Sequence, residues 1–334
     1  MTGIYLRRDQ PVFNLLHRYF MFMGRGPQPR YLGNNGRPDT LTDEQLREDA
    51  FHVARQLVEK QGQALIRSTF GRGIVGDPGF RHPIPTEVKH QVLNFVTEAS
   101  EAAGVMIGAY GSWASASGLS QLRYLYETFA YVSWLLDGDE DMRRSRALTL
   151  VADAIDLLRK NDPYWQKLIR QDPSARIFAA RYKEIAARAQ QDLDVFARDK
   201  GIAYAKRKPA REEVMNTYGL DLGAYPAFAA ISNAGSHPNA LQPLLVYGEL
   251  HTGVTDFDFA GKNMQRAYWI MQCCACIHAL YEISAPVLGW QRWPEISERW
   301  VQLAEPLRTE AVRRFNKVLE PDLAGQEQPQ ARLG

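Results

Sequence analysis

One stretch of the chain, Leu119 to Leu136, limits its possible folds more than any other. Its sequence, LSQLRYLYETFAYVSWLL, places apolar or aromatic side chains on nearly every side of a helix, and only Arg123 and Glu127 are charged. A helix that is apolar all round is a buried helix, because in solvent it would expose large side chains to water. The stretch therefore predicts a core helix around which the other helices pack.

The bulk composition is that of a soluble globular protein. The 334 residues are 45% hydrophobic and 23% charged, and a chain of this length can bury a core without disulfides. The net charge of +2 favours neither nucleic acid nor an anionic membrane as a partner. The three cysteines lie together at 273, 274 and 276, which favours a reducing, cytoplasmic compartment. The N-terminal residues lack the apolar region of a signal peptide.

A second apolar stretch, Phe259 to Leu288, predicts another buried helix. Its inner part, Ala267 to Leu288, is the one candidate for a membrane span. That part contains Gln272, His278 and Glu282, and a span that crosses lipid would carry fewer polar groups. We therefore expect a core helix and no membrane segment.

The remaining chain divides into further helices, and no stretch alternates as a β-strand does. Thr42 is a predicted N-cap, and Gln45 completes a capping box. We predict an all-α fold, a multi-helix bundle built around two buried helices with no substantial sheet. A single helical domain covers 1–319, and a polar outer helix begins a candidate peripheral subdomain at 173–218. The tail, 320–334, is expected to be disordered.

Glycine and proline residues set the predicted helix ends. The helix that starts at Pro85 is expected to end near Gly104, before small residues at 105–118 that form either a hinge or a close-packing segment. Asp162-Pro163 is expected to break the helix that precedes it, and the last helix is expected to run over 294–319.

Arg123 and Glu127 lie one turn apart in the first buried helix, where an unpaired charge is costly. One interpretation is a structural ion pair that orients neighbouring helices. The other is a polar cluster beside a cleft. A distant histidine, His237, is crowded by Ser232 and Asn233 in the sequence ISNAGSHPN. This segment is typical either of a helix exit or of a site.

The polar pair and the histidine segment form one pattern, which reads Arg123-x-x-x-Glu127, then Tyr225…Phe228…Ile231-Ser232…His237-Pro238. This pattern resembles a bacterial family of all-helical proteins of unknown function, similar in style to HEPN and abortive-infection proteins. The resemblance covers about Leu119 to Leu245. It implies a helical bundle, a homodimer and a role in bacterial defence, with RNA or a protein as partner. For the HEPN group it implies metal-independent RNA cleavage by an Arg and a His.

The chain departs from the HEPN spacing. Where that pattern places its arginine, this sequence has Ala230, Ile231 and Ser232. Arg123 is then the candidate to stabilise phosphate charge, with His237 as the acid–base group. Together with Glu127 these residues would form the catalytic cluster, without a cofactor. The alternatives are a non-catalytic protein-interaction module, with aromatic grooves near Trp290 and Trp293, and a metal-dependent helical enzyme.

Two residue pairs support the metal-dependent alternative. Asp49-x-x-His52 and Glu87-x-x-His90 have the spacing of a di-iron half-site on a helix, and Glu127 is an inward carboxylate that would add a ligand. Surface histidines on amphipathic helices would explain the same residues.

Two further groups have a chemical and a structural interpretation. The acidic run Asp137, Asp139, Glu140 and Asp141 resembles the Mg²⁺–diphosphate motif of class I terpene cyclases. A solvated turn followed by a helix N-terminus would also carry such charges. The three cysteines share one apolar helix with His278, where buried thiols are more typical than zinc ligands.

Overall fold

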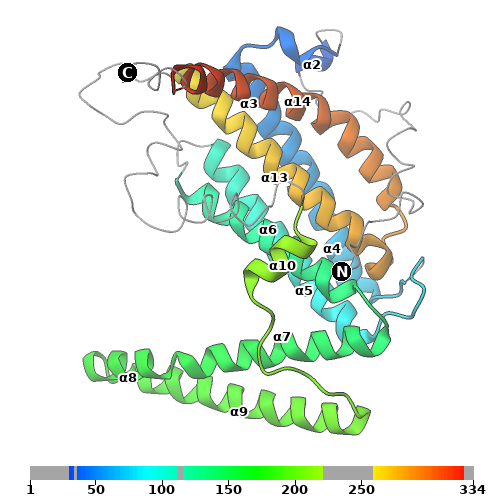
Figure 1. Cartoon of the computed structure of the whole chain (residues 1–334), viewed down its shortest axis with the longest axis vertical. Helices are drawn as coiled ribbons and strands as arrows, with labels where there is room; N and C mark the ends of the chain where they lie inside the picture. The colour runs from blue at the N-terminus through cyan, green and yellow to red at the C-terminus, as the bar shows by residue number, and fades with distance from the viewer. Residues whose placement is uncertain (1–29, 34–35, 78, 112–115, 221–258, 327–334) are drawn as a thin grey trace, which may run out of the picture.

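The computed structural model describes residues 30–33, 36–77, 79–111, 116–220 and 259–326 (Figure 1). Every regular element in this part of the chain is helical, so the predicted all-α class is confirmed. In chain order the elements are α2 (Arg30–Gly33), η2 (Pro38–Thr40), α3 (Asp43–Ala54), η3 (Arg55–Gly62), α4 (Gln63–Arg72), α5 (Thr86–Gly111), α6 (Ala116–Leu136), α7 (Glu140–Lys160), α8 (Asp162–Gln171), α9 (Ala175–Lys200), α10 (Arg211–Tyr218), α13 (Phe259–Leu288) and α14 (Trp293–Gln326).

The central helix is α13, which packs against α3, α5, α6 and α14 (Figure 1). Its bounds are those predicted, and Cys273, Ile277 and Tyr281 expose no surface. Asn263–Leu288 is long and apolar enough to cross a membrane, yet 67% of its most apolar window is buried inside the protein. Burial of this apolar surface against other helices stabilises the fold, which is the role of a core helix. The second predicted buried helix is therefore confirmed.

The first predicted buried helix is α6, which lies against α5 and α13. Leu122, Val132 and Leu135 expose no surface. The helix begins at Ala116, slightly before the predicted start at Leu119. The bundle is thus built around two buried helices, as its apolar stretches predict.

The helix α5 is longer than predicted, and it continues through Gly104 to Gly111. Glycine costs about 1 kcal/mol in a helix interior. Met106, Ile107 and Tyr110 are buried in the core and offset this cost. Of the two interpretations of 105–118, the hinge is wrong over 105–111, where the chain is helical, and the close-packing segment stays open.

Before α5, the helices α3, η3 and α4 follow one another without a break, and η3 is a π-helical stretch. The predicted capping box is confirmed. The Thr42 side chain accepts from the Gln45 N–H at 3.2 Å, and the Gln45 side chain accepts from the Thr42 N–H at 2.9 Å. Farther along, Gly62 lies against Tyr281, where an added Cβ would sit 2.5 Å from the hydroxyl oxygen. Only glycine allows so close an approach to α13.

We call α7, α8 and α9 the arm, because they extend along one end of the bundle (Figure 1). In the figure α7 and α8 run nearly end to end and α9 returns beside them, with α7 between α9 and the bundle. The arm has its own small hydrophobic cluster, whose buried members are Leu148, Ala152, Ile155, Ala186, Leu193 and Ala197. The arm is therefore held together separately from the main core.

The helix break predicted at Asp162-Pro163 is confirmed, because α7 ends at Lys160. The sequence did not predict that Asp162-Pro163 also begins α8, where proline is tolerated in the first turn because the N–H has no helical partner there. The helices α7 to α9 form the arm, and α10 packs against α6. The subdomain at 173–218 stays a prediction. At the other end of the chain, α14 continues past Leu319 to Gln326.

Candidate functional site

The half-buried carboxylate of Glu127 on α6 has a partner that the sequence did not predict. Glu127 Oε1 lies 3.0 Å from Nε of Arg211, at the start of α10. The next turn of α6 adds Tyr131, whose hydroxyl donates to the carbonyl of Pro209 at 3.3 Å, and Lys208 lies 4.4 Å above its ring. Glu127 therefore helps to attach α10 and the segment before it to the bundle.

The other two residues of the predicted catalytic cluster are placed less fully. Arg123 is half-buried one turn before Glu127 on α6. His237 lies outside the described residues, together with the rest of the 221–258 segment. The convergence of Arg123, Glu127 and His237 therefore stays a prediction.

The five candidate metal ligands are not brought into one centre. Asp49 is buried and accepts from the backbone N–H of Tyr31 at 3.0 Å. Glu87 forms an ion pair with Arg144 at 2.8 Å, and His90 is exposed. The other two candidates, on α3 and α6, are half-buried. Within the residues that the structure describes, no group of three or more His, Cys, Asp or Glu side chains could hold a metal ion.

The acidic run before α7 is engaged in structural contacts. Asp139 caps α7, because its side chain accepts from the Met142 N–H at 2.9 Å. Asp137 accepts from the Tyr218 hydroxyl at 2.8 Å and lies 3.7 Å from Arg146. These contacts match the structural interpretation of a turn followed by a helix N-terminus.

The three cysteines are buried free thiols on α13. Burial raises the pKa of each thiol, and for Cys276 the pKa rises to about 12. A thiol with a raised pKa stays protonated near neutral pH and is a poor nucleophile. These residues therefore act as small apolar side chains of the core.

A polar group joins α13 to α14 beneath the aromatic core. His278 Nε2 lies 2.9 Å from Ser297 Oγ, and Ser297 donates to Glu282 at 3.2 Å. Trp293 also donates to Glu282, at 2.6 Å. The rings of Trp293 and Trp300 each lie 5.4 Å from the imidazole, centre to centre. These residues form a packed contact between α13 and α14, which we call the joint. In the sequence, His278 was singled out but Ser297 was not.

This joint also corrects a prediction about the surface. Trp290 and Trp293 were expected to border aromatic grooves, but both are buried in a cluster of rings with Tyr281 and Trp300. The indole of Trp290 donates to Thr69 at 2.7 Å. These tryptophans therefore stabilise the core and are not available to a partner.

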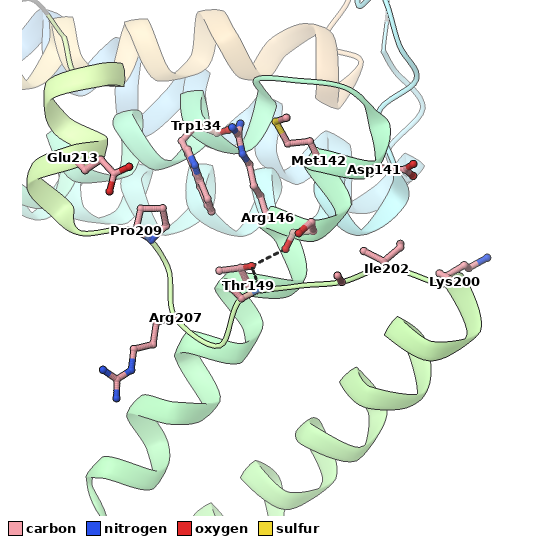
Figure 2. Close-up of a pocket in the computed structure, with 14 residues that line it drawn as sticks. Trp134, Asp141, Met142, Arg146, Thr149, Lys200, Ile202, Arg207, Pro209 and Glu213 are labelled. Carbon is pink, nitrogen blue, oxygen red and sulfur yellow. Dashed lines mark hydrogen bonds between the residues drawn. The ribbon is translucent and has the colours of Figure 1, made fainter. Parts of the chain in front are cut away.

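A pocket of about 760 Å³ lies where the arm meets the bundle (Figure 2). Its walls come from the end of α6, the first half of α7 and the extended segment 201–210, which we call the strap. Thr149 accepts from the backbone N–H of Ala205 at 3.1 Å and so holds the strap across α7. The lining residues are Trp134, Asp141, Met142, Ser145, Arg146, Thr149, Lys200, Gly201, Ile202, Ala203, Ala205, Arg207, Pro209 and Glu213.

The charges of the pocket are mixed. Arg146 is fixed in place, because it donates to the carbonyls of Trp134 and Asp137 and stacks 5.2 Å from the Trp134 ring. Figure 2 shows Arg207 and Lys200 directed outward from the rim. The pocket thus has an apolar and aromatic wall with cations at its edge, an arrangement that suits a polar or anionic ligand.

The arm carries the most unusual surface in the described part of the chain. On α8 and the first half of α9, large apolar side chains face solvent, with exposed fractions of 73% for Tyr164, 76% for Ile177 and 63% for Phe178. We define the apolar tip as six exposed residues of these two helices: Tyr164, Leu168, Ile177, Phe178, Tyr182 and Ile185. No residue of α8 is fully buried, so this amphipathic helix has an apolar side with little to cover it.

The apolar tip was not predicted, although the sequence contains its signal. Tyr164 and Leu168 have the i, i+4 spacing of one helix face, but a break was expected at Asp162-Pro163. On α9 the alternating charges predicted a solvated helix. The apolar residues Phe178, Tyr182 and Ile185, which share one face of that helix, were therefore not recognised in the sequence.

Comparison of the chain with protein-family models, with curated proteins and with solved structures found no match in any of the three.

Proposed function

We propose that this chain is a non-catalytic protein-interaction module that binds its partner through the apolar tip of the arm. The observation that carries the proposal is where the exposed apolar side chains gather. Of the twelve large apolar residues exposed in the described part of the chain, nine lie on α7, α8 and α9. Clusters of this kind mark interaction surfaces, because a partner removes their apolar area from water.

The contacts of the candidate catalytic groups support the same proposal. Glu127 forms an ion pair with Arg211 of α10, and Asp139 caps α7. Asp137 accepts a hydrogen bond from the hydroxyl of Tyr218. The cysteine thiols have raised pKa values and are buried. Each group thus has a structural task that explains its presence in the sequence.

The proposal can be tested by placing a photo-crosslinking amino acid at the tip. Benzoylphenylalanine at position 178 is compared with the same residue at position 70, because Phe178 and Phe70 are exposed to 63% and 64% in the free chain. Phe70 lies on α4, away from the arm. We expect a protein adduct from position 178 and none from position 70. Equal adducts at both positions, or none at either, would refute the proposal.

A second candidate function is RNA binding or cleavage, as the HEPN resemblance implies. One observation favours it: the strap carries Lys206 and Arg207, both exposed, and Arg207 lies at the rim of the pocket. Arg207 lies 3.6 Å from Asp156 of α7, an exposed ion pair that phosphate can displace at small cost. In the enzymatic form, Arg123 and His237 perform the cleavage and the strap holds the RNA backbone.

Fluorescence anisotropy with a single-stranded RNA oligonucleotide tests this candidate. Lys206→Glu with Arg207→Glu is expected to weaken binding at least about tenfold and to reduce its salt dependence. Arg292→Glu, an exposed cation between α13 and α14, serves as the control. Cleavage is followed on a gel with His237→Ala and Arg123→Ala. Undiminished binding by the strap variant, together with intact RNA for the wild type, would exclude the RNA function.

A further inference from the structure

We infer that the partner of the apolar tip is a second copy of this chain, with its α9 antiparallel to the first. This inference rests on the proposed function, that of a protein-interaction module, and identifies the protein that the module binds. Phe178, Tyr182 and Ile185 follow one another at steps of four and three residues, the spacing of a helix–helix seam. All three are exposed, and the Tyr182 ring lies 5.1 Å from that of Trp165 on α8, so in the described part of the chain this half of the seam is only partly covered.

The same line continues along α9 with different side chains. Ala189 and Phe196 keep the spacing, and both are partly buried against the small cluster of the arm. Asp192, between them, places a charge on the seam. The first half of the seam is thus large, apolar and exposed, whereas the second half contains a small residue, a charge and the partly buried Phe196. In an antiparallel pair, the first half of one seam packs against the second half of the other. The large side chain of Ile185 then fills the space that the small Ala189 of the other copy leaves.

The charges beside the seam favour this orientation. At 3.6 residues per turn, Arg181, Arg188, Asp192 and Asp199 lie within about 40° of one another around α9. The two arginines come first and the two aspartates follow. In an antiparallel pair the arginine half of each α9 lies beside the aspartate half of the other, and the register that sets Ile185 against Ala189 brings Arg181 to Asp192 of the other copy. A parallel pair in register sets like charges together. Arg181 also pairs with Glu184 in its own helix, at 2.9 Å.

Three of these four charges have no ion pair of their own. Within the described part of the chain, Arg188, Asp192 and Asp199 lie in no salt bridge. The position of α9 is also favourable, because α7 separates it from the bundle and its other side faces outward (Figure 1). A two-fold pair formed here is closed, since each copy uses the same surface, and it does not grow into a filament.

Sedimentation equilibrium of the full chain measures the association directly. We expect a wild-type dimer. Phe178→Glu and Ile185→Glu are expected to raise its dissociation constant at least about tenfold. The control is Phe70→Glu, at a position as exposed as Phe178 but outside the arm, which leaves the dimer intact. Thermal unfolding of each variant verifies that the arm still folds. A wild type that is monomeric at every concentration overturns the inference.

Disulfide trapping tests the orientation. Chains carrying Arg181→Cys are mixed with chains carrying Asp192→Cys, and the native cysteines are buried and do not interfere. An antiparallel pair crosslinks in the mixture and much less in either sample alone, whereas a parallel pair crosslinks in the Arg181→Cys sample alone. The parallel result would overturn the inference.

The inference and the proposed function fail in different ways. If the chain is monomeric but position 178 still yields an adduct with another protein, the second copy is wrong and the interaction module stands. If the chain is monomeric and position 178 yields no adduct beyond that of position 70, both are wrong.

Discussion

Glu127 of α6 and Arg211 of α10 form an ion pair across two elements that lie far apart in sequence, with 3.0 Å between Oε1 and Nε. The pair lies beside Tyr131, and burial together with the charge of Glu127 raises the pKa of this tyrosine to about 12. The phenol therefore stays protonated and donates to the carbonyl of Pro209. The carboxylate of Glu127 thus helps to hold the chain against the bundle where it returns from the arm. Its place in a catalytic cluster stays a prediction.

Removing this charge should loosen α10. We expect Glu127→Gln to lower the free energy of unfolding by about 1 kcal/mol, since the pair is partly exposed and screened by water. Hydrogen exchange should rise in α10 before it rises in α13. The control is Arg207→Ala, at an exposed strap position, with a change within about 0.5 kcal/mol. Unchanged exchange in α10 would show that the pair does not hold this helix.

A glycine in the loop before α5 controls how closely that loop approaches α13. A Cβ added to Gly76 would lie 2.5 Å from Cα of Gly289 and 2.6 Å from the carbonyl oxygen of Pro286. Because these are backbone atoms, they move only with the chain. We expect Gly76→Ala to cost about 1–3 kcal/mol in urea denaturation.

The matched control for Gly76 is Gly71, in the last turn of α4. A Cβ added there meets no atom within 4 Å, so Gly71→Ala should be neutral or slightly stabilising. Equal stability of the two variants would contradict the close approach of the loop.

The fold was predictable because its two apolar stretches leave few alternatives. Leu122 and Ile277 lie on helices with apolar side chains on nearly every side, and such helices have to be buried. Local rules were also sufficient for the Thr42–Gln45 capping box. They failed at Gly104, where burial outweighs a poor helix propensity. They placed the end of α7 correctly but missed α8, because the proline that follows one helix also begins the next.

The contacts of the candidate site were far less predictable. The sequence singled out Glu127, but its partner Arg211 is distant along the chain and follows the arm, so no spacing rule joins them. Similarly, Trp293 and Ser297 meet Glu282 only because α14 folds back along α13. Exposure depends on the assembled fold as well. The apolar line through Phe178 resembles a core-facing stripe in the sequence, but its side chains are exposed in the part of the chain that the structure describes.

The joint between α13 and α14 should make stability depend on pH. Burial lowers the pKa of His278, although the charges of Glu282 and Glu305 oppose the shift. In the unfolded chain the imidazole has its ordinary pKa of 6.5. As the pH falls below about 6.5 the unfolded chain binds the proton first, so the free energy of unfolding decreases. Above that pH His278 is neutral in both states, so it does not make the free energy of unfolding depend on pH.

The variant His278→Gln tests this dependence, because glutamine can still bond to Ser297. In urea denaturation from pH 7.5 down to about 5, we expect the wild type to lose stability and the variant to lose less. His90→Gln, at an exposed position, controls for the loss of an imidazole. Identical slopes for the wild type and His278→Gln would contradict the buried, neutral histidine.

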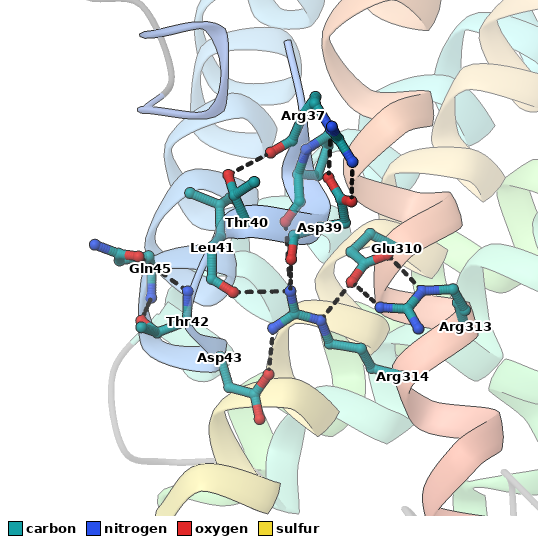
Figure 3. A network of polar contacts seen from close by, with 11 residues as sticks. Arg37, Asp39, Thr40, Leu41, Thr42, Asp43, Gln45, Glu310, Arg313 and Arg314 are labelled. Carbon is teal, nitrogen blue, oxygen red and sulfur yellow. Dashed lines mark hydrogen bonds and ion pairs between the residues drawn. The ribbon is translucent and has the colours of Figure 1, made fainter. Parts of the chain in front are cut away.

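Arg314 of α14 connects this helix to the beginning of α3 (Figure 3). Arg314 Nε donates to Glu310 at 2.6 Å, Nη1 to Asp43 at 2.6 Å, and Nη2 to the carbonyl of Leu41 at 2.8 Å. Glu310 is buried and also binds Arg313, and the two arginines hold its pKa below the usual value. The guanidinium is therefore the centre of a network that joins two distant segments.

Truncating this arginine leaves the buried carboxylate of Glu310 with one partner fewer. We expect Arg314→Ala to lower the free energy of unfolding by about 2–4 kcal/mol, because the mostly buried carboxylate of Glu310 then lacks the positive charge that offsets its loss of hydration. Arg313→Ala removes a more exposed cation from the same carboxylate and should cost about 1 kcal/mol or less. Because the pKa of Glu310 is depressed, the stability it contributes is present above its unfolded pKa of about 4.5 and is lost as the pH falls through the folded value. Arg314→Ala should therefore also flatten the acid limb of a urea-denaturation series, and an acid limb as steep as that of the wild type would show that this network does not set the pKa of Glu310.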